Sequence, residues 1–169
     1  MHIRTLQPHE ASLFREVRLR ALADSPNAFA ETLQQAQTQP QTYWEMLTHS
    51  LSQPNSHVMF LAEQAGLVVG FTFGLVDRQD SKTGHLGGMW VDPTCRAQGI
   101  GSALIAEVLT WAQQRSQTKL ELWVTEGNVK AMGLYKKVGF VDTGKRDVLP
   151  SNPALQIIQM SLRIFTAIT

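Results

Sequence analysis

The sequence is poor in cysteine and in charged residues. Its 169 residues include a single cysteine, Cys95, which excludes an internal disulfide framework and a zinc site built on two cysteines of one chain. Fifteen Lys and Arg residues are balanced by fourteen Asp and Glu residues, so the formal charge is +1. This balance excludes the strong positive field of a non-specific nucleic-acid binder, and we expect no nucleic-acid partner.

Long hydrophobic runs are also missing. The longest apolar stretch, GLVVGFTFGLV at 66–76, is far shorter than the ~20 residues that cross a bilayer as a helix. The first residues, MHIRTLQPHE, lack the apolar core of a secretory signal. With 43% apolar and 17% charged residues, the composition is that of a globular chain rather than a disordered one. We therefore expect one cytoplasmic domain, residues 1–169, with no membrane partner.

Hydrophobic periodicity predicts two helices near the N-terminus. Apolar side chains at helical spacing follow Pro8, and this helix is expected to end at Asp24-Ser25-Pro26. A second helix is expected from Pro40 to Ser52-Gln53-Pro54. The polar stretch between them, residues 31–41, is expected to be a helix end followed by a loop.

Most of the remaining chain has the two-residue period of strands. Strands are predicted at 2–6, 57–63, 67–77, 84–91, 119–124, 139–146 and 156–164, with further helices after residue 99 and at 128–137. In 67–77, the residues Leu67, Val69, Phe71, Phe73 and Leu75 are expected to share one face. A strand–helix–strand–helix–strand unit among otherwise antiparallel strands predicts a mixed α/β sheet.

A glycine-containing loop leads directly into an amphipathic helix. In CRAQGIGSALI, residues 95–105, Gly99 and Gly101 let the backbone turn without a Cβ penalty. The first N–H groups of the helix and its positive end suit a phosphate or pyrophosphate, and Arg96 adds a guanidinium beside them. These residues alone are equally compatible with a helix start that binds no ligand.

Two other phosphate-binding patterns fit this loop poorly. Nothing in the chain matches the G-x-x-x-x-G-K-[ST] sequence of a P-loop. The dinucleotide pattern G-x-G-x-x-G/A would have Leu104 in place of its third small residue, and residues 92–98 separate its glycines from the preceding strand. Glu126 lies near the spacing of a ribose-binding acid, but these two departures outweigh it.

A second motif, NVKAMGLYKKVGF at 128–140, combines a helix cap with a tyrosine. Asn128 suits the N-cap of a short helix. Leu134 and Tyr135 are adjacent and cannot share a helical face, so we expect Leu134 in the core and Tyr135 in a cleft. A phenol there can donate a proton to a departing thiolate. A plain cap and a packing tyrosine would explain the same residues.

Together the two motifs resemble the GNAT superfamily of acyl-CoA-dependent N-acyltransferases. The family pattern R/Q-x-x-G-x-G/A, with a V-x-P element before it, is met by Val91, Pro93, Arg96, Gly99 and Gly101. The pattern N-x-x-A-x-x-L-Y-x-x-x-G-F is met by Asn128, Ala131, Leu134, Tyr135, Gly139 and Phe140. The resemblance extends from residue 2 to residue 164. It implies the GNAT fold: an α/β, or α+β, mixed sheet with flanking helices, mostly antiparallel and splayed between the strands at 84–91 and 119–124.

The resemblance implies acetyl-CoA as cosubstrate and no metal. Tyr135 corresponds to the general acid of the family. The Gly87-Gly88 interruption is expected to be a bulge that opens an acyl slot. Backbone N–H groups near Val91 are expected to polarise the thioester carbonyl. The expected cofactor-binding residues are Met89, Trp90, Val91, Arg96, Ala97, Gln98, Gly99, Ile100, Gly101, Ser102 and Asn128.

One departure from the family concerns the general base. Members that use a carboxylate often place a Glu on the strand equivalent to 84–91, and this strand has none. A remote group acting through water remains open, and the candidates are Glu31, Asp77, His85 and Glu126, with deprotonation by solvent as the alternative. Trp44 and Trp90 are candidates for the wall of an acceptor pocket, although core packing suits Trp44 better.

The predicted function is N-acetyl transfer from acetyl-CoA to a primary amine, directly and within a ternary complex. Cys95 lies beside the predicted phosphate loop rather than the acyl slot, which disfavours a covalent carrier. The acceptor can be a small-molecule or peptide amine, and a homodimer is compatible with the sequence. The alternative from another class is a non-catalytic acyl-CoA-binding or sensor module.

Overall fold

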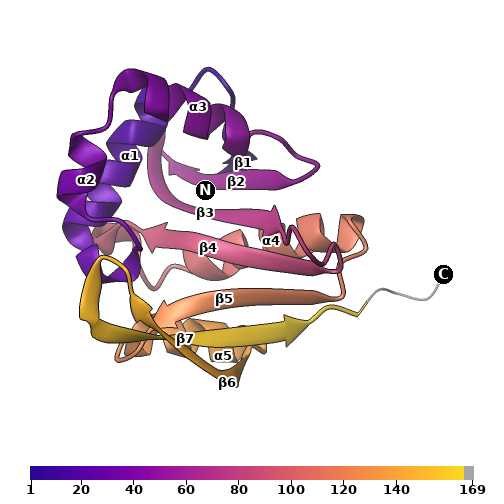
Figure 1. Cartoon of the computed structure of the whole chain (residues 1–169). Coiled ribbons are helices and arrows are strands. Elements are labelled where there is room, and N and C mark those ends of the chain that lie inside the picture. The colour runs from indigo at the N-terminus through magenta and orange to yellow at the C-terminus, as the bar shows by residue number, and fades with distance from the viewer. Residues whose placement is uncertain (166–169) are drawn as a thin grey trace.

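The computed structural model describes residues 1–165, which form a seven-stranded sheet with helices on both faces (Figure 1). The strands are β1 His2–Thr5, β2 His57–Gln64, β3 Leu67–Val76, β4 Thr83–Val91, β5 Lys119–Thr125, β6 Val141–Leu149 and β7 Asn152–Arg163. The helices are α1 Ala11–Asp24, α2 Leu33–Gln37, α3 Gln41–Leu51, α4 Ile100–Gln114 and α5 Val129–Val138, with short 3-10 turns η1 Pro26–Ala28 and η2 Pro93–Cys95. No helix among the described residues has the length and apolar character needed to cross a bilayer.

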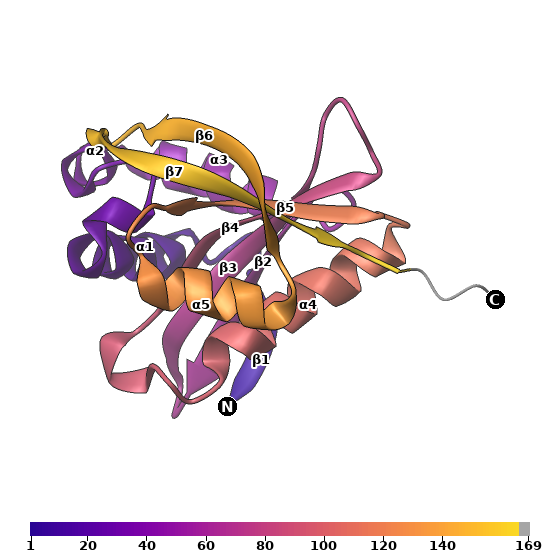
Figure 2. The same cartoon turned by 90° about the horizontal axis from the view of Figure 1, so that it is seen from below.

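Two hydrophobic cores lie on opposite faces of the sheet. On one face, α1 and α3 pack Phe14, Val17 and Trp44 against β2, β3 and β4. On the other face, α4 and α5 cover the sheet (Figure 2). The amphipathic helix predicted after the glycine loop is confirmed as α4, in which Leu104, Ile105, Val108 and Ala112 are all fully buried.

The sheet opens between its two central strands. Its order is β1-β2-β3-β4-β5-β7-β6, and every neighbouring pair is antiparallel except β4 and β5. These two pair only at Thr83–Lys119, Gly84–Leu120 and His85–Glu121. The predicted splay between 84–91 and 119–124 is therefore confirmed.

A bulge in β4 follows the point where the strands part. The pairing of β3 with β4 shifts between Phe71–Trp90 and Phe73–Gly87, and Gly88 takes a left-handed φ of 60°. The expected bulge at Gly87-Gly88 is thus confirmed. A residue other than glycine rarely adopts this φ, which explains why glycine stands at 88.

Two local expectations were wrong. The five residues of strand 67–77 do not share a face: Val69 packs in the α4 core whereas Phe71 packs in the α1 core. An extra residue at 69 shifts the pairing of β2 with β3 and reverses the alternation. Within 31–41, the predicted loop contains the helix α2, because Thr32 and Gln35 form a reciprocal capping box.

Candidate active site

A narrow slot of about 70 Å³ lies where β4 and β5 separate. Its walls come from β4, β5 and α5, with one residue from η1: Ala28, Leu86, Gly87, Gly88, Met89, Trp123, Val124, Thr125, Asn128, Ala131 and Tyr135. At Gly87 and Gly88, the β4 wall is main chain. A Cβ at Gly87 would lie 2.4 Å from the Phe73 ring, and one at Gly88 would lie 2.8 Å from it. At these two positions, peptide groups rather than side chains therefore line the slot.

Tyr135 is the one buried residue of α5. Its ring packs edge-on against Phe140, at 5.9 Å between centroids, and the residue is 5% exposed. Burial raises the pKa of the Tyr135 phenol, so the hydroxyl keeps its proton at neutral pH. The sequence-based placement of Tyr135 in a cleft agrees with this geometry. Leu134 is half-buried and lies against α4, close to Gly101.

The loop before α4 is open to solvent. Arg96, Ala97, Gln98 and Gly99 are all exposed, and Ala97 and Gly99 have left-handed φ values of 62° and 83°. Gly99 is the N-cap of α4, and no side chain caps the helix there. The first N–H groups of α4 consequently lack a capping acceptor, which is the arrangement that binds phosphates at helix ends.

Arg96 is engaged elsewhere, which the sequence did not predict. Its Nε donates to the Val91 carbonyl at 2.9 Å, and its Nη2 donates to the Asp24 carboxylate. The Trp90 indole donates to the same carboxylate at 2.9 Å. Arg96 therefore ties the loop to the end of α1 rather than standing as a free cation beside it. Its positive charge is already neutralised by Asp24.

The predicted cofactor-binding stretch of β4 divides between slot and core. Met89 lines the slot, but the Trp90 side chain is 4% exposed and belongs to the α1 core. Trp44 is fully buried against Phe14. Neither tryptophan forms a wall of the slot. That wall includes Trp123, which is 41% exposed and which the sequence analysis overlooked.

The four candidate bases lie in three separate places. Asp77 and His85 form a pair, with Asp77 Oδ2 2.8 Å from His85 Nε2, and the hydrogen bond from His85 lowers the pKa of Asp77 to about 2. Glu31 is bound by Arg18 at 2.6 Å. Glu126 is exposed and directly follows β5. Only the Asp77–His85 pair brings two of the candidates together.

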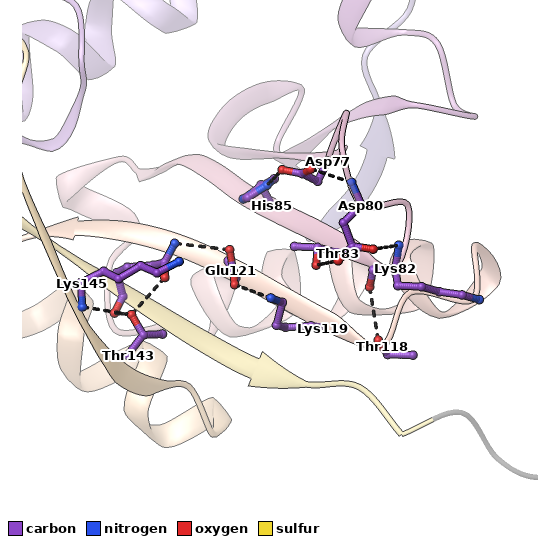
Figure 3. Close-up of polar contacts among 11 residues, drawn as sticks. Asp77, Asp80, Lys82, Thr83, His85, Thr118, Lys119, Glu121, Thr143 and Lys145 are labelled. Carbon is purple, nitrogen blue, oxygen red and sulfur yellow. Dashed lines mark hydrogen bonds and ion pairs between the residues drawn. The ribbon is translucent and has the colours of Figure 1, made fainter.

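A polar row crosses the sheet beside this pair (Figure 3). Glu121 accepts a bond from Lys119 at 2.8 Å and one from Gln159 at 3.3 Å, and Thr143 donates to Gln159 at 3.0 Å. On the α1–α3 face, the strand residues of the core come from β2, β3 and β4, and the polar row lies beyond them on β5 and β7. The sequence did contain a sign of this polar row. In β5, Lys119, Glu121 and Trp123 alternate with three apolar residues that are buried.

Residues 19–140, which include the loop, the slot and Tyr135, match the model of the acetyltransferase (GNAT) family. The chain belongs to the GNAT family. Among curated proteins, it is 31% identical over 145 residues to the mycothiol acetyltransferase of Thermobispora bispora, covering 83% of this chain and 46% of that protein. It is 39% identical over 64 residues to the peptidyl-lysine N-acetyltransferase YjaB of Salmonella typhimurium, covering 38% of this chain and 41% of that protein. The matched segments thus cover less than half of either relative.

Solved structures show that the chain has the GNAT fold. A GNAT-family acetyltransferase from Streptococcus pneumoniae has a TM-score of 0.82 at 21% identity, covering 97% of this chain and 99% of that one. YncA of Salmonella typhimurium, solved with its cofactor acetyl-CoA, has a TM-score of 0.79 at 17% identity, covering 100% and 96%. The mixed, mostly antiparallel sheet predicted from the sequence is the sheet of this fold.

Proposed function

We propose that this GNAT domain, residues 1–169, is an N-acetyltransferase that moves the acetyl group of acetyl-CoA to a primary amine within a ternary complex. The observation that carries the proposal is the slot itself. The buried, protonated phenol of Tyr135 and the main chain of Gly87 and Gly88 line the same slot, beside the only parallel strand pair of the described sheet. The open start of α4 follows at the end of the same strand, β4.

The residues around the slot fit acetyl-CoA. On the side facing β5, the main chain of β4 beyond His85 has no partner strand, and it can pair with amide groups as a sheet edge does. The exposed loop Arg96–Gly99 and the start of α4, including Gly101 and Ser102, suit the diphosphate. Acetyl-CoA, when bound, supplies the acyl thioester.

His85 and Asp77 form the base that the geometry favours. An ionised carboxylate can only accept, so Nε2 of His85 is the donor to Asp77, and Nδ1 is the ring nitrogen left for proton transfer. His85 lies two residues before Gly87, about 6.6 Å along the strand, so a proton would pass from the amine to His85 through water. Glu31 is less suited, because Arg18 already holds its carboxylate.

Tyr135 supplies the proton for the sulfur. Its raised pKa keeps the phenol protonated while negative charge develops on the departing thiolate. The slot lining contains no cysteine within the described residues, and Cys95 is the last residue of η2, outside that lining, which disfavours a covalent carrier. The two relatives, a mycothiol acetyltransferase and a peptidyl-lysine N-acetyltransferase, support a small-molecule or peptide amine as acceptor.

A panel of amines tested for release of CoA thiol decides the proposal. The panel contains polyamines, amino acids, aminosugars, cysteinyl amines and lysine peptides. Thiol release that depends on one amine class, together with an acetylated product detected by mass spectrometry, supports the proposal. Tight binding of acetyl-CoA without amine-dependent release would instead favour the acyl-CoA-binding module.

A further inference from the structure

A threonine of the neighbouring strand holds the main chain of the β4 bulge. Thr72 lies on β3 and is fully buried. Its hydroxyl donates to the carbonyl oxygen of Gly87 at 2.9 Å. Gly87 still pairs with Phe73, and the register of β3 and β4 shifts directly after it, to Phe71–Trp90. Thr72 therefore holds the Gly87 carbonyl toward β3 at the point where the register shifts.

The same hydrogen bond fixes the direction of an N–H group. The carbonyl of Gly87 and the N–H of Gly88 belong to one peptide unit. A trans peptide is planar, so these two groups point in opposite directions. A carbonyl held toward β3 turns the Gly88 N–H away from β3. Gly88 lines the slot, and β5 does not pair with β4 at this level.

Phe73 restrains the bulge from the other face. Consecutive residues of a strand point to opposite faces, so Thr72 and Phe73 hold the bulge between them. The Phe73 ring fills the space that side chains at 87 and 88 would need. Two adjacent glycines have unusually free backbones, and without these contacts the 87–88 peptide would have other orientations open to it.

We propose that Thr72 is a positioning residue: its hydroxyl orients the 87–88 peptide so that the Gly88 N–H donates to the acyl carbonyl of the thioester in the slot. This inference rests on the proposed function. Because the Gly88 N–H would already point at the acyl oxygen, it would stabilise the negative charge that develops there without any reorganisation during the reaction. Thr72 itself touches neither substrate.

The test compares Thr72→Val with Thr48→Val. Valine keeps the shape of threonine and removes the hydroxyl. Thr48 is a matched control, because it is equally buried but its hydroxyl has no hydrogen-bond partner. We expect Thr72→Val to lower kcat by about 10-fold or more, with a smaller weakening of acetyl-CoA binding, since loss of one such donor costs roughly 10²–10³-fold. Thr72→Ser restores most of kcat, and Thr48→Val leaves kcat unchanged.

A binding measurement separates this inference from the proposed function. CoA lacks the acyl carbonyl, so the ratio of its Kd to that of acetyl-CoA reports the Gly88 donor without any turnover. We expect Thr72→Val to reduce this ratio and Thr72→Ser to preserve it. If no amine is acetylated by the wild type, the proposed function fails and the ratio still decides the role of Thr72.

An unchanged ratio, an unchanged kcat, or a loss of kcat that serine does not restore would each overturn the inference. If Thr72→Val does not fold, Thr72→Cys replaces it, because a thiol is a weaker donor than the serine hydroxyl. Equal kcat and equal affinity ratios for Thr72→Ser and Thr72→Cys would then contradict the role of the hydrogen bond.

Discussion

The two ends of the candidate site use glycine for opposite reasons. At the loop before α4, a Cβ on Gly99 would meet nothing within 4 Å, and glycine is required by its φ of 83°. At the bulge, Gly87 has no left-handed φ, and a Cβ there would meet the Phe73 ring at 2.4 Å. The exposed end is shaped by backbone conformation and the buried end by packing. We infer that the exposed end provides affinity and the buried end provides chemistry.

The largest effect is expected at Tyr135. Tyr135→Phe removes one hydroxyl and keeps the ring packed on Phe140. Because the proton donor acts only as charge develops on sulfur, we expect the single-turnover rate to fall by about 10²–10⁴-fold. The melting temperature and the acetyl-CoA affinity should stay near those of the wild type. A folded variant with the wild-type rate would remove Tyr135 from the mechanism and leave the family assignment intact.

The next largest effect is expected from filling the bulge. Gly87→Ala forces its Cβ into the Phe73 ring, and we expect a loss of about 1–3 kcal/mol in the free energy of unfolding, with slower turnover. Phe73→Leu removes the obstructing atoms, so the double variant should lose less than the sum of the two single variants. Denaturant titrations of the four proteins measure this coupling, and strict additivity would show that Phe73 is not what excludes a side chain at 87.

A smaller effect on folding, but a selective one on binding, is expected at the loop. Gly99→Ala and Gly66→Ala place the same side chain on similar φ values, 83° and 78°, with open space at both positions. Each should cost about 1–2 kcal/mol in stability. Only Gly99→Ala should weaken acetyl-CoA binding, by roughly tenfold, in calorimetric titrations. Gly101 is a poorer test, since a Cβ there would lie 2.8 Å from Leu134.

The smallest effect is expected at Arg96. Its pair with Asp24 is partly exposed, so Arg96→Gln should change stability by less than about 1 kcal/mol. If the N–H groups of the loop bind the diphosphate, CoA should still bind more tightly than pantetheine in this variant, and added salt should still weaken that preference. If Arg96→Gln bound CoA and pantetheine equally tightly, Arg96 would be a phosphate ligand.

Local pattern predicted the parts of this site that lie within one motif. The loop glycines, the cap Asn128 and the buried Tyr135 all follow from residues a few positions apart, and the glycine pair was sufficient to predict the bulge. The bond from Arg96 to Asp24 joins residues 72 positions apart, so no local pattern contained it. The capping box at Thr32 and Gln35 was visible in the sequence, but the glutamine-rich composition around it suggested a loop.

The long-range parts of the site needed the structure. The bond from Thr72 to Gly87 lies where a bulge shifts the register of β3 and β4, and a strand pattern cannot show which peptide that bond holds. The pairing of Asp77 with His85 likewise depends on the register of β3 and β4. Trp123 was missed because an exposed tryptophan in a half-buried strand resembles an ordinary core residue in sequence.

The single-turnover rate measured against acetyl-CoA concentration, for the wild type, Gly99→Ala and Tyr135→Phe, tests the division between the two ends most directly. The account predicts that Gly99→Ala shifts the half-saturating concentration roughly tenfold and keeps the saturating rate, while Tyr135→Phe lowers the saturating rate at an unchanged half-saturating concentration. A Gly99→Ala protein whose saturating rate falls as far as that of Tyr135→Phe would contradict it.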